Sequence, residues 1–232
     1  MITAKFKDQL EAAGKLIEIL PKKELVDKKT IVVCMSLESV ILTDAVCRSL
    51  NLSYEMLFSE PIPAPNNSEC DVAIVSETED IVLNDKLIKA FNISYDYIYG
   101  EAHRKYEEKI LKNVYKYRKG NLIGELKDKN ILLIDEGCET GMTALICIKT
   151  LLDVKVKSIS YATPVIATDV FTNLNDMVDE IYTINKIVDF IDVDSYYEKK
   201  IEATSERIMS ILEESPHYLP LQKQQGDKNN AI

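Results

Sequence analysis

Apolar residues recur along this chain in two different patterns, and the two patterns alternate. The first apolar residues recur at helical spacing and predict an amphipathic first helix, which Pro21 ends. These residues are Phe6, Leu10, Ala13, Ile17 and Leu20. Short, continuous apolar runs predict strands at residues 31–35, 53–58, 71–76, 81–83, 130–134, 157–161 and 180–183. Helical patterns return at residues 38–50, 143–152 and 194–212, and over residues 84–117 with a break near Gly100.

One segment between these elements has the composition of a loop. Residues 59–68 contain Pro61, Pro63 and Pro65 together with two asparagines, and such segments are typical of turns. Strands that alternate with helices predict an α/β fold, with a mostly parallel sheet flanked by helices and joined by right-handed crossovers. We expect a single domain over residues 1–214 and a polar, disordered tail over residues 215–232.

Composition narrows the functions that this domain can have. The chain has 232 residues, a formal net charge of −10 and 46% apolar residues, as in an ordinary soluble protein. The negative charge disfavours broad nucleic-acid binding, so no nucleic-acid partner is expected. No apolar run approaches the roughly 18 residues that span a bilayer, and residues 1–10 lack the apolar core of a signal peptide. Five cysteines without a CxxC pair argue against a disulfide framework or a zinc site, so we expect a cytoplasmic protein away from membranes.

The most informative segment follows the predicted strand at residues 130–134. Asp135 and Glu136 end the strand, a turn with two glycines follows, and then a helix begins. The start of that helix presents backbone N–H groups and two hydroxyls, which suits a phosphate monoester, at Glu139, Thr140, Gly141, Met142 and Thr143. Glycine at position 141 allows the backbone to approach the phosphate closely. The two carboxylates would accept hydrogen bonds from sugar hydroxyls, or hold a hydrated Mg²⁺.

Each of these features also has a plain structural interpretation, because an acidic pair can start a turn and Thr-Gly can cap a helix. Only the whole ordered string favours a ligand site. The string lacks the GxxxxGK[ST] pattern of a P-loop, and the absence of G-x-G-x-x-G disfavours a dinucleotide site. His103 and His217 are the only histidines, so a Ser-His-Asp triad is not expected either.

Residues 135–143 resemble the phosphoribosyl-diphosphate motif of the type I phosphoribosyltransferases. In that motif an acidic pair and two variable residues precede a small residue, Thr-Gly, one residue and Thr. Further segments resemble a bacterial branch of uncharacterised phosphoribosyltransferase-domain proteins, at residues 6–8, 13–14, 117–118, 162–165 and 193–197. The whole resemblance spans roughly residues 6–205. The resemblance implies a phosphoribosyltransferase type I-like (Rossmann-like) fold, and it suggests a homodimer.

The resemblance also implies a concrete reaction. The donor would be phosphoribosyl diphosphate with Mg²⁺, a nitrogen nucleophile would attack its anomeric carbon, and pyrophosphate would leave. By matching position, Asp135 and Glu136 would be the catalytic residues that bind the ribose hydroxyls, and residues 139–143 would wrap the 5′-phosphate. The pyrophosphate loop would follow the first strand, at Ser36, Leu37, Glu38 and Ser39. In the family a mobile loop ahead of the motif brings basic residues to the donor, and Arg118 is the candidate here.

Three positions depart from the family pattern in the same electrostatic direction. The loop after the first strand lacks the Pro-Arg-Gly-Gly of the resembling branch and carries Glu38. Ser59 and Glu60 stand where the branch has a basic pair, and Glu139 replaces a small residue. Each added carboxylate repels pyrophosphate unless Mg²⁺ intervenes.

Two main hypotheses for the function therefore remain. The first is an enzyme of nucleotide metabolism, a glycosyltransferase that moves the phosphoribosyl group to a nitrogenous base or related acceptor. The second is a catalytically degenerate protein that binds a nucleotide or sugar phosphate for regulation, or engages a protein partner. The loop at residues 36–39 separates them, because loss of its glycines favours binding without turnover. A phosphate-ester hydrolase is a third hypothesis, since a fold does not determine a function.

Overall fold

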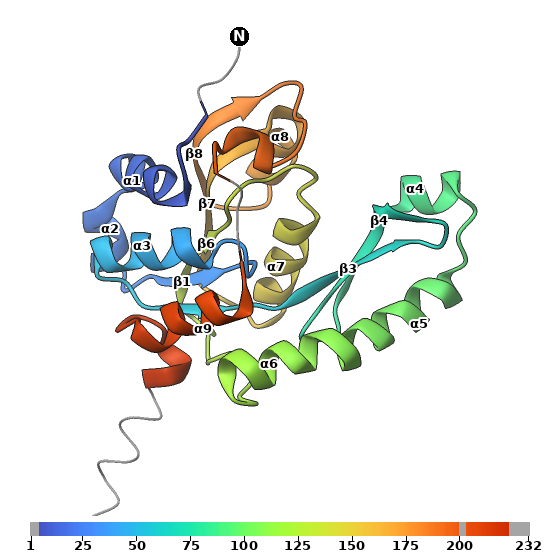
Figure 1. Cartoon of the computed structure of the whole chain (residues 1–232), viewed down its shortest axis with the longest axis horizontal. Coiled ribbons are helices and arrows are strands. Elements are labelled where there is room, and N and C mark those ends of the chain that lie inside the picture. The colour runs from blue at the N-terminus through green and yellow to red at the C-terminus, as the bar shows by residue number, and fades with distance from the viewer. Residues whose placement is uncertain (1–4, 200–202, 223–232) are drawn as a thin grey trace, which may run out of the picture.

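Five parallel strands form the central sheet of the computed structural model, which describes residues 5–199 and 203–222 (Figure 1). Their order in space is β2-β1-β6-β7-β8, so the strand order reverses between β1 and β6. The bounds are β1 Ile31–Cys34, β2 Tyr54–Met56, β6 Asn130–Ile134, β7 Ser158–Ala167 and β8 Glu180–Ile187. In such sheets, ligands bind outside the carboxyl ends of the strands at the point of reversal. The fold therefore directs attention to the residues that follow β1 and β6.

Helices cover both faces of this sheet (Figure 1). Successive side chains of a strand point to opposite faces. Val32 and Cys34 therefore join one hydrophobic cluster with α1 and α3, whereas Val33 joins a second cluster with α7 and α8. The helices of this layer are α1 Gln9–Ile19, α2 Lys22–Asp27, α3 Val40–Leu50, α7 Met142–Asp153, α8 Thr168–Asn175 and α9 Ser205–Glu214. Within the described residues, no helix combines the length and the apolar character that crossing a membrane requires.

A second, antiparallel sheet is inserted between β2 and β6 and projects to one side of the parallel layer (Figure 1). Its strands are β3 Ser59–Ala64, β4 Asn67–Ser76 and β5 Ile81–Leu83, in the order β3-β4-β5. The strands predicted at residues 71–76 and 81–83 are confirmed, and they pair as an antiparallel hairpin. Two helices, α4 Asp85–Ala90 and α5 Tyr95–Lys105, accompany this sheet.

The prediction of a loop at residues 59–68 is wrong, because β3 occupies residues 59–64. β3 lies at the edge of the antiparallel sheet, beside β4. An edge strand tolerates proline, since the side that faces away from the sheet needs no N–H donors. The pairing also shifts register on either side of Pro63. Proline content alone therefore could not distinguish this edge strand from a loop.

The helical region at residues 84–117 is interrupted at a different place than predicted. The helix α5 continues through Gly100, since one glycine in a helix costs only about 1 kcal/mol. The interruption lies between α4 and α5, where Asn92 has a φ of 50° and the side chain of Ser94 caps the next helix. A π-helical turn at Tyr106–Ile110 then leads into α6 Leu111–Arg118.

The C-terminal region also differs from the prediction of one helix over residues 194–212. A 3-10 turn at Asp194–Tyr196 ends at Tyr197, which pairs with Phe6, and α9 begins only after the cap residue Thr204. The prediction was thus wrong about where this helix starts, and residues 200–202 lie outside the described part. The predicted start of a disordered tail at residue 215 is also too early, because Tyr218 is fully buried against Tyr54. Residues 223–232 of that tail lie outside the described residues.

Candidate functional site

The carboxyl ends of β1 and β6 bring Ser36 together with the acidic pair. The Ser36 hydroxyl lies 2.8 Å from a carboxylate oxygen of Glu136 and 3.2 Å from one of Asp135. The Asp135 carboxylate also accepts the backbone N–H of Glu136 at 3.2 Å. Tyr197 donates its hydroxyl to the Glu136 carbonyl at 2.7 Å and holds the backbone from the other side. The acidic pair is therefore held by two distant segments, the loop after β1 and the turn at Tyr197.

Burial shifts the titration of both carboxyl groups in the same direction. Burial raises the pKa of Asp135 well above its usual range, and repulsion from Glu136 raises it further. Burial also raises the pKa of Glu136, although the hydrogen bonds that it accepts, including the one from Ser36, oppose that rise. A ligand that supplies hydrogen-bond donors or positive charge would favour the ionised form of this pair and so bind well to it.

The turn after the acidic pair is pinned to β7. The Cys138 N–H donates to the Val165 carbonyl, and the Ala167 N–H donates to the Cys138 carbonyl, each at 2.9 Å. Burial raises the pKa of the Cys138 thiol to about 12, which disfavours the reactive thiolate form. Gly141 then takes a φ of 74° and begins α7 as its N-cap residue.

Close packing explains why position 141 needs glycine. A Cβ atom there would lie 2.7 Å from Cγ1 of Val170, and the left-handed backbone itself disfavours other residues. Thr140 is exposed beside it, and its hydroxyl accepts the Met142 N–H at 3.4 Å. The segment from Thr140 to Thr143 therefore presents hydroxyls and a helix N-terminus to the space above the sheet.

The loop after β1 uses much of its own hydrogen-bonding capacity. The Ser39 N–H donates to the Ser36 hydroxyl at 3.0 Å, and the Ser36 N–H donates to the Ser39 hydroxyl at 3.3 Å. The Glu38 carbonyl accepts a hydrogen bond of 2.7 Å from the side-chain amide of Gln9. Two of the four N–H groups at the predicted pyrophosphate loop are thus already occupied.

Two adjoining cavities, of 380 Å³ and 530 Å³, open above these segments, between the parallel and antiparallel sheets. The larger one is lined by the acidic pair and by residues 137–144. The smaller one has apolar walls from Leu57, Phe58 and Ile74. Both cavities share the residues Ser36, Glu38, Asp71, Thr140, Met142 and Thr143. A ligand that occupies both would contact the acidic pair, the turn at Gly141 and the loop after β1.

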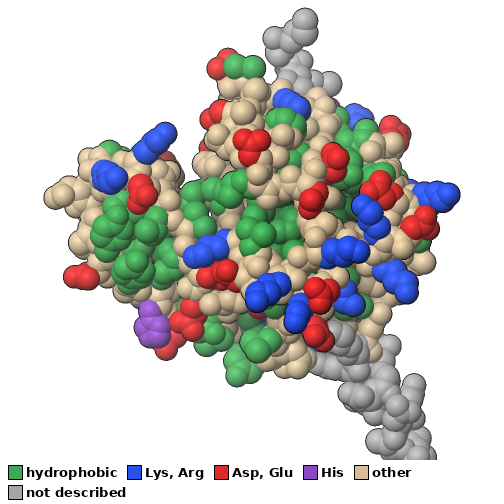
Figure 2. All heavy atoms as spheres, turned by 180° about the vertical axis from the view of Figure 1, so that it is seen from behind, with side chains coloured by type: hydrophobic (Ala, Val, Ile, Leu, Met, Phe, Trp, Pro, Cys, Tyr) green, Lys and Arg blue, Asp and Glu red, His purple; other side chains and the backbone are tan. Residues whose placement is uncertain are grey.

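Carboxylates dominate the charge of both cavities. Among the described residues that line them, none is Lys, Arg or His, and the acidic ones are Glu38, Glu60, Glu69, Asp71, Asp135, Glu136 and Glu139. Lys105 approaches from outside, with Nζ 3.9 Å from the Glu60 carboxylate. On the face seen in Figure 2, by contrast, positive and negative side chains are interspersed. The carboxylates of the cavities oppose anionic ligands unless a cation accompanies them.

Most of the predicted site residues thus meet at these cavities, and two do not. Ser36, Leu37 and Glu38, the acidic pair and residues 139–143 line them. Ser39 lines neither cavity, because it is buried and hydrogen-bonded to Ser36. Arg118 lines neither cavity, because its side chain is fully buried in an ion pair with Glu77. Asp71 and Glu69 were not predicted, since they lie on a strand of the antiparallel sheet whose position relative to the motif is not visible in the sequence.

The donor set suits a metal that arrives with its ligand. Over the described ranges 5–199 and 203–222, no group of three or more His, Cys, Asp or Glu side chains is placed to hold a metal ion. Asp135 and Glu136 offer carboxylate oxygens of the kind that Mg²⁺ prefers, but Mg²⁺ usually completes its shell with water and substrate phosphates. These two residues would hold such an ion together with a bound phosphate compound.

Comparison with solved structures shows the fold. A protein designated TT1426 from Thermus thermophilus is 23% identical over 91% of this chain and 99% of that chain, with a TM-score of 0.71. The strand order and the flanking helices confirm the predicted α/β fold class, a mostly parallel sheet flanked by helices. No protein-family model matches the chain, and no curated protein matches it.

Phosphoribosyltransferases are among the more distant structural neighbours. Hypoxanthine phosphoribosyltransferase from Trypanosoma cruzi is 10% identical over 86% of each chain, with a TM-score of 0.45. Purine phosphoribosyltransferase from Pyrococcus horikoshii is 13% identical over 78% of this chain and 93% of that chain, with a TM-score of 0.42. At these scores the likeness carries no argument about the activity of this chain.

Proposed function

We propose that this chain binds phosphoribosyl diphosphate with Mg²⁺ and transfers the phosphoribosyl group to a nitrogenous base or related acceptor. One observation carries the proposal: Asp135, Glu136 and the Thr140–Thr143 segment line the same 530 Å³ cavity at the point where the strand order reverses. This brings carboxylates for a sugar diol within one cavity of hydroxyls and backbone N–H groups for a phosphate.

The chain's own residues divide the work in this proposal. The Thr140 and Thr143 hydroxyls and the N-terminus of α7 hold the 5′-phosphate, and Gly141 allows the close approach. Asp135 and Glu136 accept hydrogen bonds from the ribose hydroxyls and favour the positive charge that develops on the sugar as the bond to pyrophosphate breaks. Bound Mg²⁺ supplies the charge that offsets the diphosphate, since the lining residues provide carboxylates and no cation.

The smaller cavity has the apolar surface that a flat acceptor needs. Leu57, Phe58 and Ile74 line it beside the loop after β1, and Asn113 adds a polar side chain from α6. In this arrangement the acceptor nitrogen would approach the anomeric carbon from the side of the antiparallel sheet. Catalysis would consist mainly of orienting the two ligands.

A second candidate function is favoured by the loop after β1. Ser36 and Ser39 satisfy each other's backbone N–H groups, and Glu38 adds a carboxylate where a diphosphate would lie. These features support a catalytically degenerate protein that binds a nucleotide or sugar phosphate through the Thr140–Thr143 segment alone.

Calorimetric titration separates the two candidates. Phosphoribosyl diphosphate, with and without Mg²⁺, is compared with ribose 5-phosphate on the full chain. Mg²⁺-dependent binding of the diphosphate that is at least about tenfold tighter than binding of ribose 5-phosphate supports the transferase. Equal binding of both supports the degenerate protein, and no binding of either contradicts both. An acceptor screen for pyrophosphate release then tests turnover.

A further inference from the structure

The position of the antiparallel sheet determines the shape of both cavities. Glu60 and Ile74 reach the smaller cavity from β3 and β4, whereas Met35 and Thr143 reach it from the parallel layer. Phe58 lies at the junction, directly between β2 and β3, and also lines this cavity. Contacts that fix Phe58 therefore fix one wall of the cavity.

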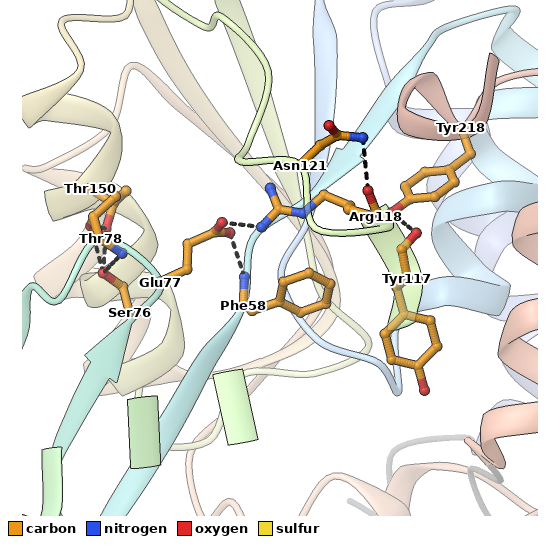
Figure 3. Close-up of polar contacts among 9 residues, drawn as sticks. All are labelled: Phe58, Ser76, Glu77, Thr78, Tyr117, Arg118, Asn121, Thr150 and Tyr218. Carbon is orange, nitrogen blue, oxygen red and sulfur yellow. Dashed lines mark hydrogen bonds and ion pairs between the residues drawn. The ribbon is translucent and has the colours of Figure 1, made fainter. Parts of the chain in front are cut away.

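Arg118 and Glu77 make those contacts from the buried side (Figure 3). The Arg118 guanidinium donates to one carboxylate oxygen of Glu77, and the other oxygen accepts the Phe58 N–H at 3.0 Å. The guanidinium carbon also lies 4.9 Å from the centre of the Phe58 ring, in the range of a cation–π contact. One ion pair thus holds both the backbone and the ring of Phe58.

The clamp formed by Arg118, Glu77 and Phe58 ties together three segments far apart in the chain. Glu77 follows β4, and Arg118 ends α6. The end of α6 is itself held, since Tyr218 donates its hydroxyl to the Tyr117 carbonyl at 3.2 Å (Figure 3). The two charges of the clamp are nearly inaccessible to water, with side-chain exposures of 0% and 3%.

Joining segments through a buried ion pair carries a desolvation cost, because both charges leave water. Nε and Nη1 of Arg118 have no hydrogen-bond acceptor among the described residues, so the guanidinium is only partly compensated. Apolar side chains of similar volume would often be as stable as a buried ion pair. The clamp therefore contributes a defined geometry more than it contributes stability.

We propose that Arg118 is a positioning residue that, with Glu77, fixes Phe58 and thereby the wall of the 380 Å³ cavity without touching the ligand. Its importance for ligand binding rests on the proposed function, whereas the geometry itself does not. Two neighbouring contacts hold the turn that contains Glu77, after β4, to α7. The Thr150 hydroxyl of α7 donates to the Ser76 hydroxyl at 3.2 Å and lies 3.4 Å from the Thr78 hydroxyl (Figure 3).

The first test needs no ligand. Amide hydrogen exchange is measured on the wild-type chain and on Arg118→Met. If the single variant fails to fold, Arg118→Met/Glu77→Gln replaces it, because the double variant leaves no unpaired buried carboxylate. The matched control is Arg104→Met, an arginine in exposed ion pairs on α5. We expect Phe58 to exchange about tenfold faster in the folded clamp variant, with β6 and α7 unchanged.

Arg118→Lys provides a graded comparison. Lysine keeps the charge beside Glu77 but lacks the planar group that lies over the ring, so its Phe58 exchange should fall between wild type and Arg118→Met. Phe58 exchange equal to that of the Arg104→Met control would overturn the proposal. So would an equal acceleration over β6 and α7, because it would show a purely global loss of stability.

A second test asks whether the wall matters for binding. Ser36, Leu37 and Glu38 of the predicted pyrophosphate loop line the same cavity as Phe58. In the folded clamp variant, the affinity for phosphoribosyl diphosphate with Mg²⁺ should therefore fall about tenfold while that for ribose 5-phosphate changes less than about twofold. Equal losses for both ligands would contradict the role of Arg118 in shaping the smaller cavity. If wild type binds neither ligand, the proposed function fails, and the exchange measurement still decides the role of the clamp.

Discussion

The Ser36 hydroxyl donates to the Glu136 carboxylate at 2.8 Å, and this bond joins the ends of β1 and β6 across 100 positions of the chain. The same hydroxyl accepts the Ser39 N–H, so one side chain connects the loop after β1 to the acidic pair. In the proposed site these two segments hold opposite ends of the donor. Their connection through Ser36 means that a change in one alters the other.

Replacing this serine should weaken the site without unfolding the protein. Ser36→Ala removes the donor that lowers the pKa of both Asp135 and Glu136, so the pair resists ionisation more strongly. We expect about a tenfold loss in Mg²⁺-dependent binding of phosphoribosyl diphosphate, measured by calorimetry at about pH 7. Ser210→Ala, on α9 and away from both cavities, is the control. Unchanged affinity in Ser36→Ala would show that the bond has no role in binding.

The raised pKa of Asp135 predicts a pH-dependent stability. The folded protein binds this proton more tightly than the unfolded chain, so the free energy of unfolding falls as pH rises from about 4 through the raised pKa. Asp135→Asn removes this titration. We therefore expect its Tm to exceed that of wild type at about pH 8, with the difference shrinking towards about pH 4.

The control for this experiment is Asp189→Asn, at an exposed position after β8. It should show no comparable difference between about pH 4 and about pH 8. A Tm of Asp135→Asn at or below that of wild type at the higher pH would contradict the assignment of Asp135 as a destabilised carboxylate.

The hydroxyl of Thr140 should matter for binding and little for folding. Thr140 is exposed at the start of α7, so Thr140→Val should change the free energy of unfolding by less than about 0.5 kcal/mol. The loss of a phosphate-facing hydroxyl should reduce ribose 5-phosphate affinity at least about tenfold. Thr172→Val, on α8, serves as the control in the same titration. Equal affinities in the two valine variants would remove Thr140 from the site.

Gly141 should matter for folding as well. Gly141→Ala places a Cβ 2.7 Å from Val170 in a left-handed backbone, and we expect a cost of about 1–3 kcal/mol. The matched control is Gly100→Ala, where no atom lies within 4 Å of an added Cβ inside α5. That change should stabilise the protein by about 0.5–1 kcal/mol. Urea denaturation measures both, and an equal change in the free energy of unfolding at the two glycines would refute the packing argument.

The segment after α9 is part of the folded domain. Tyr218 is buried, its ring centre lies 5.2 Å from that of Tyr54, and its hydroxyl donates to the Tyr117 carbonyl. Tyr218→Ala should therefore lower the free energy of unfolding by about 3 kcal/mol. Tyr115→Ala is the control, because that ring is 69% exposed. A comparable small effect for both, in a denaturant titration, would mean that residues 215–222 contribute little to the domain.

Local sequence patterns predicted much of the fold and the centre of the site. The run of apolar residues before Asp135 is β6, and the turn with Gly141 begins α7 as predicted. Both follow from neighbours in sequence, because a buried strand needs continuous apolar side chains and a left-handed N-cap needs glycine. The same reasoning failed at residues 59–64, where proline content suggested a loop and the edge position of β3 permits a strand.

Tertiary packing decided what no local pattern contains. The sequence predicts that Arg118 contacts the donor. In the structure it forms a buried ion pair with Glu77, 41 positions earlier, and lines neither cavity. The charge of the cavities likewise depends on Asp71, which a strand of the antiparallel sheet carries to the same space as Glu136. The sequence by itself determined the buried strand β6 and the acidic pair, followed by a turn with Gly141 that begins a helix, since those depend on residues a few positions apart. Only the tertiary structure decided which charges are buried, paired or shared by one cavity, because burial and distance arise when remote segments pack together.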